Sequence, residues 1–555
     1  MSPSAAVGVR GASLSAVSAA CALMLAISVC APPTAAYGGG IGRGAFLWSY
    51  PDGFLDLNGS TYFLADDGSG LHHLWQVVGD PPASARRVTG DIRGPIGLYG
   101  RPGRFEGRLY VAGQARGDGG CGLWSSDGAP GGTRRVYEFL PDRTCLSTRQ
   151  WYPAAFTVVG DRLFFRAADP VTGAELWVTD GTTSGTRLVR NISTAPTGGD
   201  DDLSSVPEFL TAVGSILLFA AERADRPGLW RSDGTSDGTF RLAEISPRPM
   251  NDADERFAIL NGAAIFVAVD DAGTIRLWRS DGSAAGTMPI AAMGVESDLH
   301  RERPSMAVWR DRLYFLVNDA PGVLTLWASD GTVAGTAPVV SGPPGARRGA
   351  EIVATPDRLF LTMWQEGQSI LWRSDGTAAG TAAVTGRVRS VQRLMPFGGQ
   401  VIFGGTDGTT GCGLWQSDGT DDGTTVLATS AHSGGGCPLP FRHGEGPDPQ
   451  LASASQAFLG FNEGVTGYEP WTTDGTLQGT RLLIDVNAIC AADCNGDRLV
   501  TIDEIVGGIA IALGRASLDS CTAADPNGDE RVDIAEVISA IGAGLSGCGP
   551  DAASP

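Results

Sequence analysis

The sequence contains no lysine and few histidines, so all 41 basic side chains are arginines. Acidic residues number 61, which leaves a formal net charge of −20 at pH 7. This balance excludes nucleic acid as a partner, because binding to phosphates needs an excess of basic charge. The five histidines (His72, His73, His300, His432 and His443) lie in no metal-binding or catalytic pattern. We expect the pair His72-His73 to lie at a surface strand end.

Long apolar runs are also absent after the N-terminus. Within residues 1–36, Arg10 precedes an apolar stretch at 19–31, and Thr34-Ala35-Ala36 offers small residues for cleavage. This order is typical of a secretory signal peptide, so we expect a secreted, extracellular bacterial protein. Anchoring as a lipoprotein through Cys30 is disfavoured, because Val29 stands where a small residue is needed. No later segment reaches the ~18 apolar residues of a membrane span, so no transmembrane segment is predicted.

The cysteines are few, and the spacing of several of them suggests pairs. Eight of the 10 lie after residue 36, and an even number in an exported chain favours disulfides. Cys121 and Cys412 each stand three residues before a tryptophan, and Cys145 and Cys437 follow them, which predicts two local bridges. Cys490, Cys494, Cys521 and Cys548 allow three pairings, and the sequence does not choose among them.

What the chain has in abundance is one repeated motif, Leu-Trp-x-Ser/Thr-Asp-Gly-Thr/Ser-x-x-Gly-Thr or a close variant. Its tryptophans are Trp124, Trp177, Trp230, Trp278, Trp327, Trp372, Trp415 and Trp471, and Leu74-Trp75 retains only the first half of the motif. Successive tryptophans are 43 to 56 residues apart, which is the length of a four-stranded propeller blade. We therefore predict a mainly β fold with one β-propeller of eight or nine four-stranded blades over residues 50–486.

The signature has a mechanical explanation. Adjacent Leu and Trp on a strand point to opposite faces, so each fills one gap between blades. The aspartate then bonds its own backbone in an Asx turn, and the glycine takes the positive φ that the turn needs. We interpret Asp127, Asp180, Asp233, Asp281, Asp330, Asp375, Asp418 and Asp474 as turn-formers. The alternative, a ring of carboxylates that binds cations or glycans, requires these aspartates to converge on one surface.

The repeat resembles a group of exported bacterial proteins with Glu-Leu-Trp-x-x-Asp-Gly-Thr units, retained most fully at residues 175–182. The resemblance implies a propeller-like fold and no particular activity.

Two 12-residue stretches near the C-terminus carry the strongest chemical signal. Both place oxygen ligands at the positions through which a short loop wraps Ca²⁺. In residues 493–504 the predicted ligands are Asp493, Asn495, Asp497, the Leu499 carbonyl, Thr501 and Glu504. In residues 525–536 they are Asp525, Asn527, Asp529, the Arg531 carbonyl, Asp533 and Glu536. The sequence therefore predicts two calcium sites, whose main effect is to fold and rigidify this segment.

An apolar helical pattern follows each loop, and no helical pattern of any length precedes the first loop. Paired loops with exit helices resemble the dockerin module, an EF-hand-like calcium module of bacterial polysaccharide-degrading complexes. We assign residues 487–550 to such a paired calcium module, and the resemblance implies a cohesin-like protein partner. The chain departs from the dockerin pattern at loop position 6, where Arg498 and Glu530 replace glycine, and at positions 10 and 11, which lack the usual hydroxyl pair.

No catalytic constellation accompanies the blades. We therefore expect a monomeric, non-enzymatic binding or scaffold protein for a glycan or cell-envelope ligand, attached through its calcium-stabilised tail. The alternative is a carbohydrate-active enzyme, a glycoside hydrolase or lyase, whose propeller is catalytic and whose tail docks it into a complex.

Overall fold

The computed structural model describes residue 49 and much of 51–546. The predicted signal peptide lies outside the described residues, as do 547–555 and the longer internal segments 67–71, 94–100, 116–119, 141–152, 194–203, 249–256, 294–304, 345–349, 431–454, 463–467, 487–491, 495–499 and 525–530. Shorter gaps interrupt the remainder.

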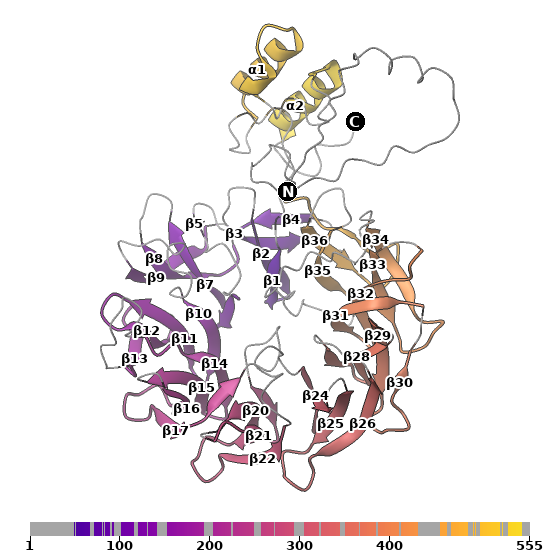
Figure 1. Ribbon diagram of the computed structural model, residues 1–555. Coiled ribbons are helices and arrows are strands. Elements are labelled where there is room, and N and C mark those ends of the chain that lie inside the picture. Colours follow the sequence, from indigo (N-terminus) through magenta and orange to yellow (C-terminus); the bar gives the residue numbers. More distant parts are fainter. Residues whose placement is uncertain are drawn as a thin grey trace, which may run out of the picture. The chain divides into compact units, whose positions relative to one another are not determined.

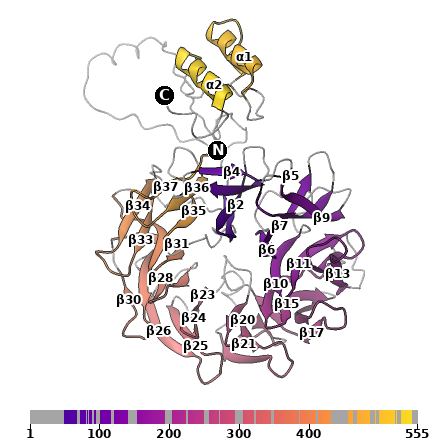
Figure 2. The ribbon, with the colours of Figure 1, turned by 180° about the vertical axis from the view of Figure 1, so that it is seen from behind.

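Nine antiparallel sheets follow one another around a ring in the described part of the chain (Figures 1 and 2). Seven are simple meanders, and in the second and fifth sheets two short strands both pair with the strand that follows them. The first three blades comprise β1 (Asp52–Leu57), β2 (Ser60–Asp66), β3 (His72–Val78) and β4 (Ser84–Arg87); β5 (Ile92–Arg93), β6 (Gly103–Phe105), β7 (Arg108–Ala115), β8 (Cys121–Ser126) and β9 (Thr133–Leu140); and β10 (Ala154–Val159), β11 (Arg162–Asp169), β12 (Gly173–Thr179) and β13 (Arg187–Arg190). The next three comprise β14 (Glu208–Val213), β15 (Ile216–Arg223), β16 (Arg226–Ser232) and β17 (Phe240–Ala243); β18 (Ser246–Arg248), β19 (Ala258–Leu260), β20 (Ala263–Val269), β21 (Ile275–Ser280) and β22 (Met288–Ala292); and β23 (Met306–Trp309), β24 (Arg312–Ala320), β25 (Val323–Ser329) and β26 (Ala337–Pro344). The last three comprise β27 (Ile352–Ala354), β28 (Leu359–Gln365), β29 (Gln368–Ser374) and β30 (Ala382–Ala383); β31 (Arg389–Phe397), β32 (Gln400–Thr406), β33 (Cys412–Ser417) and β34 (Thr425–Ser430); and β35 (Ala457–Asn462), β36 (Tyr468–Thr473) and β37 (Arg481–Leu482).

This arrangement confirms the predicted propeller and decides the blade number in favour of nine. The first unit, which lacks the Asp-Gly turn, is nevertheless a complete blade, because β3 pairs with β4 from Trp75 to Val78. The ninth sheet retains three strands within the described residues.

The signature Leu-Trp pair packs as predicted. In the third blade Leu176 belongs to the hydrophobic cluster shared with the fourth blade, whereas Trp177 belongs to the cluster shared with the second. In the sheet, Trp177 lies across from Phe165 of the neighbouring strand, and both side chains are buried. Each blade therefore contributes to two interfaces, and the core is a series of layers between blades.

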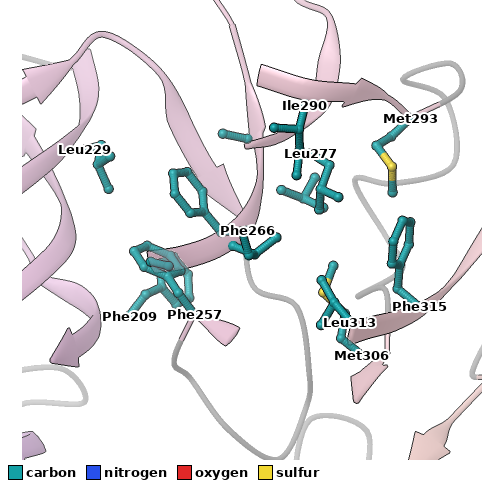
Figure 3. Packing of buried hydrophobic residues seen from close by; sticks show 14 of the residues in the cluster. Phe209, Leu229, Phe257, Phe266, Leu277, Ile290, Met293, Met306, Leu313 and Phe315 are labelled. Atoms are coloured by element: carbon teal, nitrogen blue, oxygen red, sulfur yellow. The ribbon is translucent and has the colours of Figure 1, made fainter. Parts of the chain in front are cut away.

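The largest such cluster joins the fourth, fifth and sixth blades (Figure 3). Phe257 stacks on Phe266 with ring centroids 4.6 Å apart, and Phe209 of the fourth blade lies 5.8 Å from Phe257. Burial of aromatic rings on both faces explains why the second strands are almost continuously apolar.

Outside the propeller, the described residues contain two short helices, α1 (Ile502–Ala512) and α2 (Ile534–Ser546), and one 3-10 turn at Leu518–Ser520. Helix α1 begins with a capping box, in which Thr501 and Glu504 bond each other's backbone. The fold class is therefore mainly β with two short helices. The calcium loops expected beside them lie largely outside the described residues. No helix in the described part of the chain is long and apolar enough to cross a membrane.

Candidate functional site

The Asp-Gly turn of the fourth blade shows how a signature turn is built. Oδ1 of Asp233 accepts hydrogen bonds from the backbone N–H of Thr235 at 2.8 Å and from its hydroxyl at 2.7 Å. The hydroxyl oxygen of Thr235 in turn accepts the backbone N–H of Gly238 at 3.0 Å. Ser232 and Thr239, on the two sides of the turn, are joined through their hydroxyls at 2.7 Å. This network confirms that the aspartate is a turn-former.

Two glycines of this turn cannot be replaced without strain. Gly234 has a φ of +86°, in the left-handed region that favours glycine. A Cβ on Gly238 would lie 2.1 Å from both carboxylate oxygens of Asp233. The Asp-Gly-Thr-x-x-Gly spacing is therefore a steric requirement of the turn.

The same aspartate-to-hydroxyl bond recurs around the ring and lowers the pKa of the carboxyl groups. The aspartates concerned are Asp180, Asp233, Asp281, Asp330, Asp375, Asp418 and Asp474. Each uses its Oδ1 within its own turn. Among the described residues no three His, Cys, Asp or Glu side chains lie close enough to hold a metal ion. The alternative of a cation-binding carboxylate ring thus has no support in this geometry.

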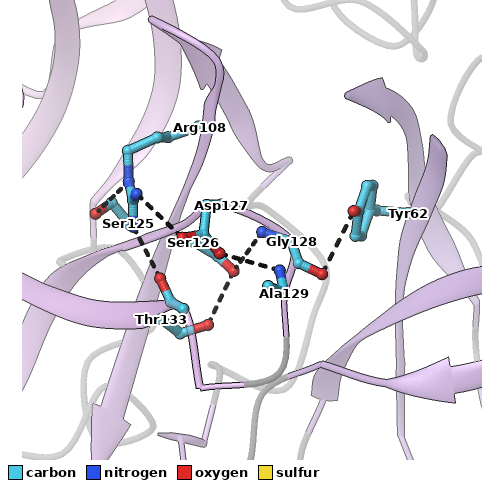
Figure 4. Close-up of polar contacts among 9 residues, drawn as sticks. Tyr62, Arg108, Ser125, Ser126, Asp127, Gly128, Ala129 and Thr133 are labelled. Atoms are coloured by element: carbon cyan, nitrogen blue, oxygen red, sulfur yellow. Dashed lines mark hydrogen bonds and ion pairs between the residues drawn. The ribbon is translucent and has the colours of Figure 1, made fainter. Parts of the chain in front are cut away.

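The turns also join neighbouring blades, a role that the sequence reasoning missed. The Tyr62 hydroxyl of the first blade donates to the carbonyl oxygen of Gly128 in the second, at 3.4 Å (Figure 4). The guanidinium of Arg187 in the third blade donates to the carbonyl of Gly234 in the fourth at 2.7 Å. In the sequence, these contacts between blades could have been recognised from an arginine or tyrosine that recurs near the end of a strand.

Two notches lie between the first hairpins of adjacent blades. One, of about 460 Å³, is lined by residues 104–107 of the second blade and by Val158, Gly160 and Asp161 of the third. The other, of about 430 Å³, lies between the seventh and eighth blades and is lined by Asp357, Arg358, residues 397–400, Asp418 and Thr420. Neither lining contains a histidine, a cysteine or a serine.

Buried glutamates connect the segments that enter and leave a blade. Glu175 accepts hydrogen bonds from the Ser205 hydroxyl at 2.5 Å and from the Ser193 N–H at 3.0 Å. Burial raises the pKa of Glu175 to about 7, although these bonds act in the opposite direction. Glu469 of the ninth blade accepts the Val486 N–H at 2.8 Å, and burial raises its pKa to about 8. In the sequence, such a buried glutamate could have been recognised by its position two residues before a signature tryptophan.

Five of the predicted calcium ligands belong to the described residues, namely Thr501, Glu504, Arg531, Asp533 and Glu536. The others, Asp493, Asn495, Asp497, Leu499, Asp525, Asn527 and Asp529, lie outside them.

The glutamates that end the two loops are held alike. One carboxylate oxygen of Glu504 accepts the Thr501 N–H at 2.9 Å, and one of Glu536 accepts the Asp533 N–H at 2.8 Å. Both glutamates are buried, at 8% and 6% exposure. The second oxygen of Glu504 accepts the Cys494 N–H at 3.0 Å. Oε1 of Glu536 is buried and accepts no hydrogen bond from the described part of the chain.

A disulfide joins Cys494 to Cys521, which selects one of the three pairings left open by the sequence. Cys121 and Cys412 are also disulfide-bonded, whereas their predicted partners Cys145 and Cys437 lie outside the described residues.

The prediction for the histidine pair was wrong. His72 and His73 are the first two residues of β3 and are buried, at 4% and 6% exposure.

Comparisons with known proteins give a likeness in fold. No family model and no curated protein matches the chain. Solved structures that match include a puromycin hydrolase (16% identity, 60% of this chain and 54% of that one, TM-score 0.33) and a prolyl endopeptidase (13% identity, 61% and 50%, TM-score 0.34). A puromycin-hydrolyzing peptidase of Mycobacterium tuberculosis matches at 12% identity over 64% and 58%, with a TM-score of 0.33. The chain thus spans about half the length of these proteins.

These neighbours require a correction. We predicted a non-enzymatic module for a glycan or cell-envelope ligand, with a carbohydrate-active enzyme as the alternative. The matching structures are peptidases and puromycin hydrolases, and the prediction is contradicted by them.

A hydrolase-like pattern does occur in the propeller. Gly234-Thr235-Ser236-Asp237-Gly238 matches Gly-x-Ser-x-Gly, which in serine hydrolases forms a sharp strand-to-helix turn. Here the segment is the hairpin turn between β16 and β17, where the Ser236 carbonyl accepts the N–H of Thr239 at 3.3 Å. The local geometry is that of a signature turn and not of a nucleophile elbow.

Proposed function

We propose that this chain is exported behind residues 1–36 and carries a C-terminal module, residues 487–550, that folds around two Ca²⁺ ions and docks a protein partner. The observation that carries the proposal is the buried Oε1 of Glu536, which accepts no hydrogen bond from any residue that the structure describes. A buried carboxylate oxygen without a donor is costly, and a cation removes that cost. The proposed ligand at this position is a bidentate glutamate, which needs both oxygens directed at the loop.

The first loop offers the same arrangement. Glu504 occupies the equivalent position, and its bond to the Thr501 N–H matches the bond between Glu536 and the Asp533 N–H. The proposed first shell is completed by the side chains of Asp493, Asn495 and Asp497 in one loop and Asp525, Asn527 and Asp529 in the other. Ca²⁺ would supply the charge that lets these carboxylates approach one another. Thr501 and Asp533 fix the glutamate that closes each site.

The helices that follow the loops support a docking role. Helix α1 exposes Ile502 and Val506, and the residue that caps its C-terminus, Leu513, is exposed seven residues further on. Helix α2 likewise exposes Ile534, Ile538 and Ile541, at intervals of four and three residues. Ile502 and Ile534 are 79% and 78% exposed, which is unusual for isoleucine in a folded module. A cohesin-like protein is the partner that the dockerin resemblance implies.

Calorimetric titration of the full exported chain with calcium chloride tests the metal sites. We expect two sites, of which Glu504→Gln and Glu536→Gln each remove one, because an amide supplies a single neutral oxygen. Asp503→Asn is the matched control, since Asp503 is exposed beside Glu504 and is outside the ligand set. Equal heat from the wild type and both glutamine variants would refute the assignment.

Docking is tested separately with an immobilised cohesin domain as the probe. Retention of the wild-type chain should require calcium and should be lost in an Ile502→Ser, Ile534→Ser double variant that still binds two calcium ions. Retention that persists in a calcium chelator would contradict a calcium-ordered docking surface.

A further inference from the structure

The entrances of the two proposed calcium loops are connected covalently. Cys494 is the second residue of the first loop, and its disulfide partner Cys521 lies four residues before the second loop. The backbone N–H of Cys494 also donates to Oε1 of Glu504, the carboxylate that closes the first site. The bridge thus acts on the first loop at a residue that touches its last ligand.

The same entrances also converge on helix α1. Ala492 and Ala524, which immediately precede the two loops, are both buried. A Cβ placed on Gly508 of α1 would lie 3.8 Å from the Ala492 Cβ and 3.7 Å from the Ala524 Cβ. Ala492 and Ala524, at the entrances of the two loops, therefore both lie close to Gly508, and the disulfide connects the two segments that contain them.

Little else in the described residues holds this arrangement in place. The hydrophobic cluster of this segment comprises Ala492, Val500 and Ala540, with Ile505 packed against it. Four small or medium side chains bury too little area to order two loops unaided.

We propose that the Cys494–Cys521 disulfide is a positioning element for both calcium sites, so that calcium affinity depends on the oxidation state of these cysteines. This inference rests on the proposed function and extends it to the conditions under which the module assembles. In an oxidising environment outside the cell the bridge holds the loop entrances together, and calcium then orders the rest. Before export, with both thiols reduced, calcium binding must restrict a much larger conformational ensemble.

The chemical step is a thiol–disulfide exchange with a dithiol reductant. The dithiol transfers two electrons and two protons, the Cys494–Cys521 bond breaks to give two thiols, and the reductant closes to a cyclic disulfide. Nothing else is consumed, and air oxidation or a disulfide oxidant reverses the step.

Calcium titrations of the full exported chain, with and without dithiothreitol, provide the first test. Reduction should weaken calcium binding by roughly tenfold or more, because a bridge across this separation restricts the unfolded chain strongly. A Cys494→Ser, Cys521→Ser double variant should bind as weakly as the reduced wild type and should not respond to dithiothreitol. That insensitivity separates this bridge from those of Cys121 and Cys412. Equal affinities for the oxidised and reduced wild type would overturn the inference.

A second measurement avoids variants that fail to fold. Coupling is reciprocal, so calcium must protect the disulfide by the same factor by which the disulfide strengthens calcium binding. Alkylation of the thiols at a series of dithiothreitol concentrations, followed by mass spectrometry of the peptides that contain Cys494 and Cys521, gives the extent of reduction. We expect calcium to shift the midpoint for this pair and leave that of the Cys121 bridge unchanged. An unshifted midpoint in a chain that binds two calcium ions contradicts the inference alone, whereas a chain that binds no calcium in its oxidised state contradicts the proposed function.

Discussion

The hydroxyl of Ser49 donates a hydrogen bond to the carbonyl oxygen of Tyr468 at 3.1 Å, across a sequence separation of 419 residues. The backbone N–H of Ser49 donates to the same carbonyl at 3.2 Å. Inside the ring, the N–H of Ser205 donates to the carbonyl of Ala174 at 3.0 Å in the same way. The segment that leads into the first blade therefore bonds the ninth blade in the same way as the segment that leads into the fourth blade bonds the third.

Side-chain packing completes this closure. Phe54 of β1 stacks on Phe458 of β35 at 6.1 Å, and Arg481 donates to the carbonyl of Pro82 at 2.6 Å. No sheet within the described residues contains strands from both ends of the chain. The contacts that close the ring within the described residues therefore lie between the first blade and the ninth.

Replacement of Ser49 by alanine should destabilise the closed ring. The variant removes the hydroxyl donor, whereas the backbone N–H of residue 49 still bonds the Tyr468 carbonyl, so we expect the free energy of unfolding to fall by about 0.5–1.5 kcal/mol. Ser236→Ala is the matched control, because Ser236 is exposed in a turn and should change stability by less than about 0.5 kcal/mol. Urea unfolding measures both. Equal stability of the two variants would show that this contact contributes nothing to closure.

The buried glutamates predict a loss of stability as the pH rises. The pKa values of Glu175 and Glu469 are raised from 4.5 to about 7 and about 8. The folded chain therefore retains protons that the unfolded chain releases, and this contribution to stability is complete below about 4.5. It is lost as the pH rises through about 7 for Glu175 and about 8 for Glu469. Unfolding free energies measured from pH 4.5 to 9 should show the decline.

Glutamine at these positions isolates the effect. Glu469→Gln keeps the shape and carries no proton equilibrium, so its stability should vary less with pH over this range. Glu138→Gln, on the more exposed strand β9, should follow the wild-type profile. A Glu469→Gln profile parallel to that of the wild type would contradict the assignment.

The sequence predicted those features that each repeat determines locally. Leu176 and Trp177 are adjacent on a strand, so their assignment to two different interfaces followed from strand geometry alone. The aspartate turns were equally local. The bond between Ser49 and Tyr468 was not predictable, because it depends on which segments the closed ring brings together. The burial of His72 and His73 was not predicted either.

The calcium module was predicted from ligand spacing and stays a prediction, because most of its proposed ligands lie outside the described residues. Glu504 and Glu536 are buried, and each accepts the backbone N–H of the residue three positions before it. The pairing of Cys494 with Cys521 could not be derived, because it depends on how the two loop entrances meet at Gly508.

The turn hydroxyls offer a sharper test of the repeat. In Thr235→Val the Asp233 carboxylate loses its hydroxyl donor and Gly238 loses its acceptor, and we expect a loss of about 1–2 kcal/mol. Thr235→Ser retains both bonds and should be near wild type. Ser283 shows why, since it occupies the same position in the fifth blade and bonds Asp281 at 2.7 Å. Thermal unfolding distinguishes the two variants, and equal stabilities would mean that the hydroxyl network contributes nothing.

The second blade supplies the converse experiment, because its turn lacks the hydroxyl. Oδ1 of Asp127 accepts the backbone N–H of Ala129 at 3.0 Å, close to the 2.8 Å of the matching bond in the fourth blade. The N–H of Gly132 donates to the Ala129 carbonyl at 2.9 Å, since no side-chain acceptor is present. The backbone is thus already placed for a threonine.

Ala129→Thr should therefore stabilise the propeller by about 0.5–1.5 kcal/mol, through a new hydroxyl bond to Asp127. The exposed Ala334, also in a signature turn but at a position whose side chain makes no such bond in the other blades, provides the control Ala334→Thr. We expect the control to remain within about 0.5 kcal/mol of the wild type in urea unfolding. If both substitutions had the same effect, the gain would come from threonine at an exposed turn position and not from the repeated hydrogen bond to the aspartate.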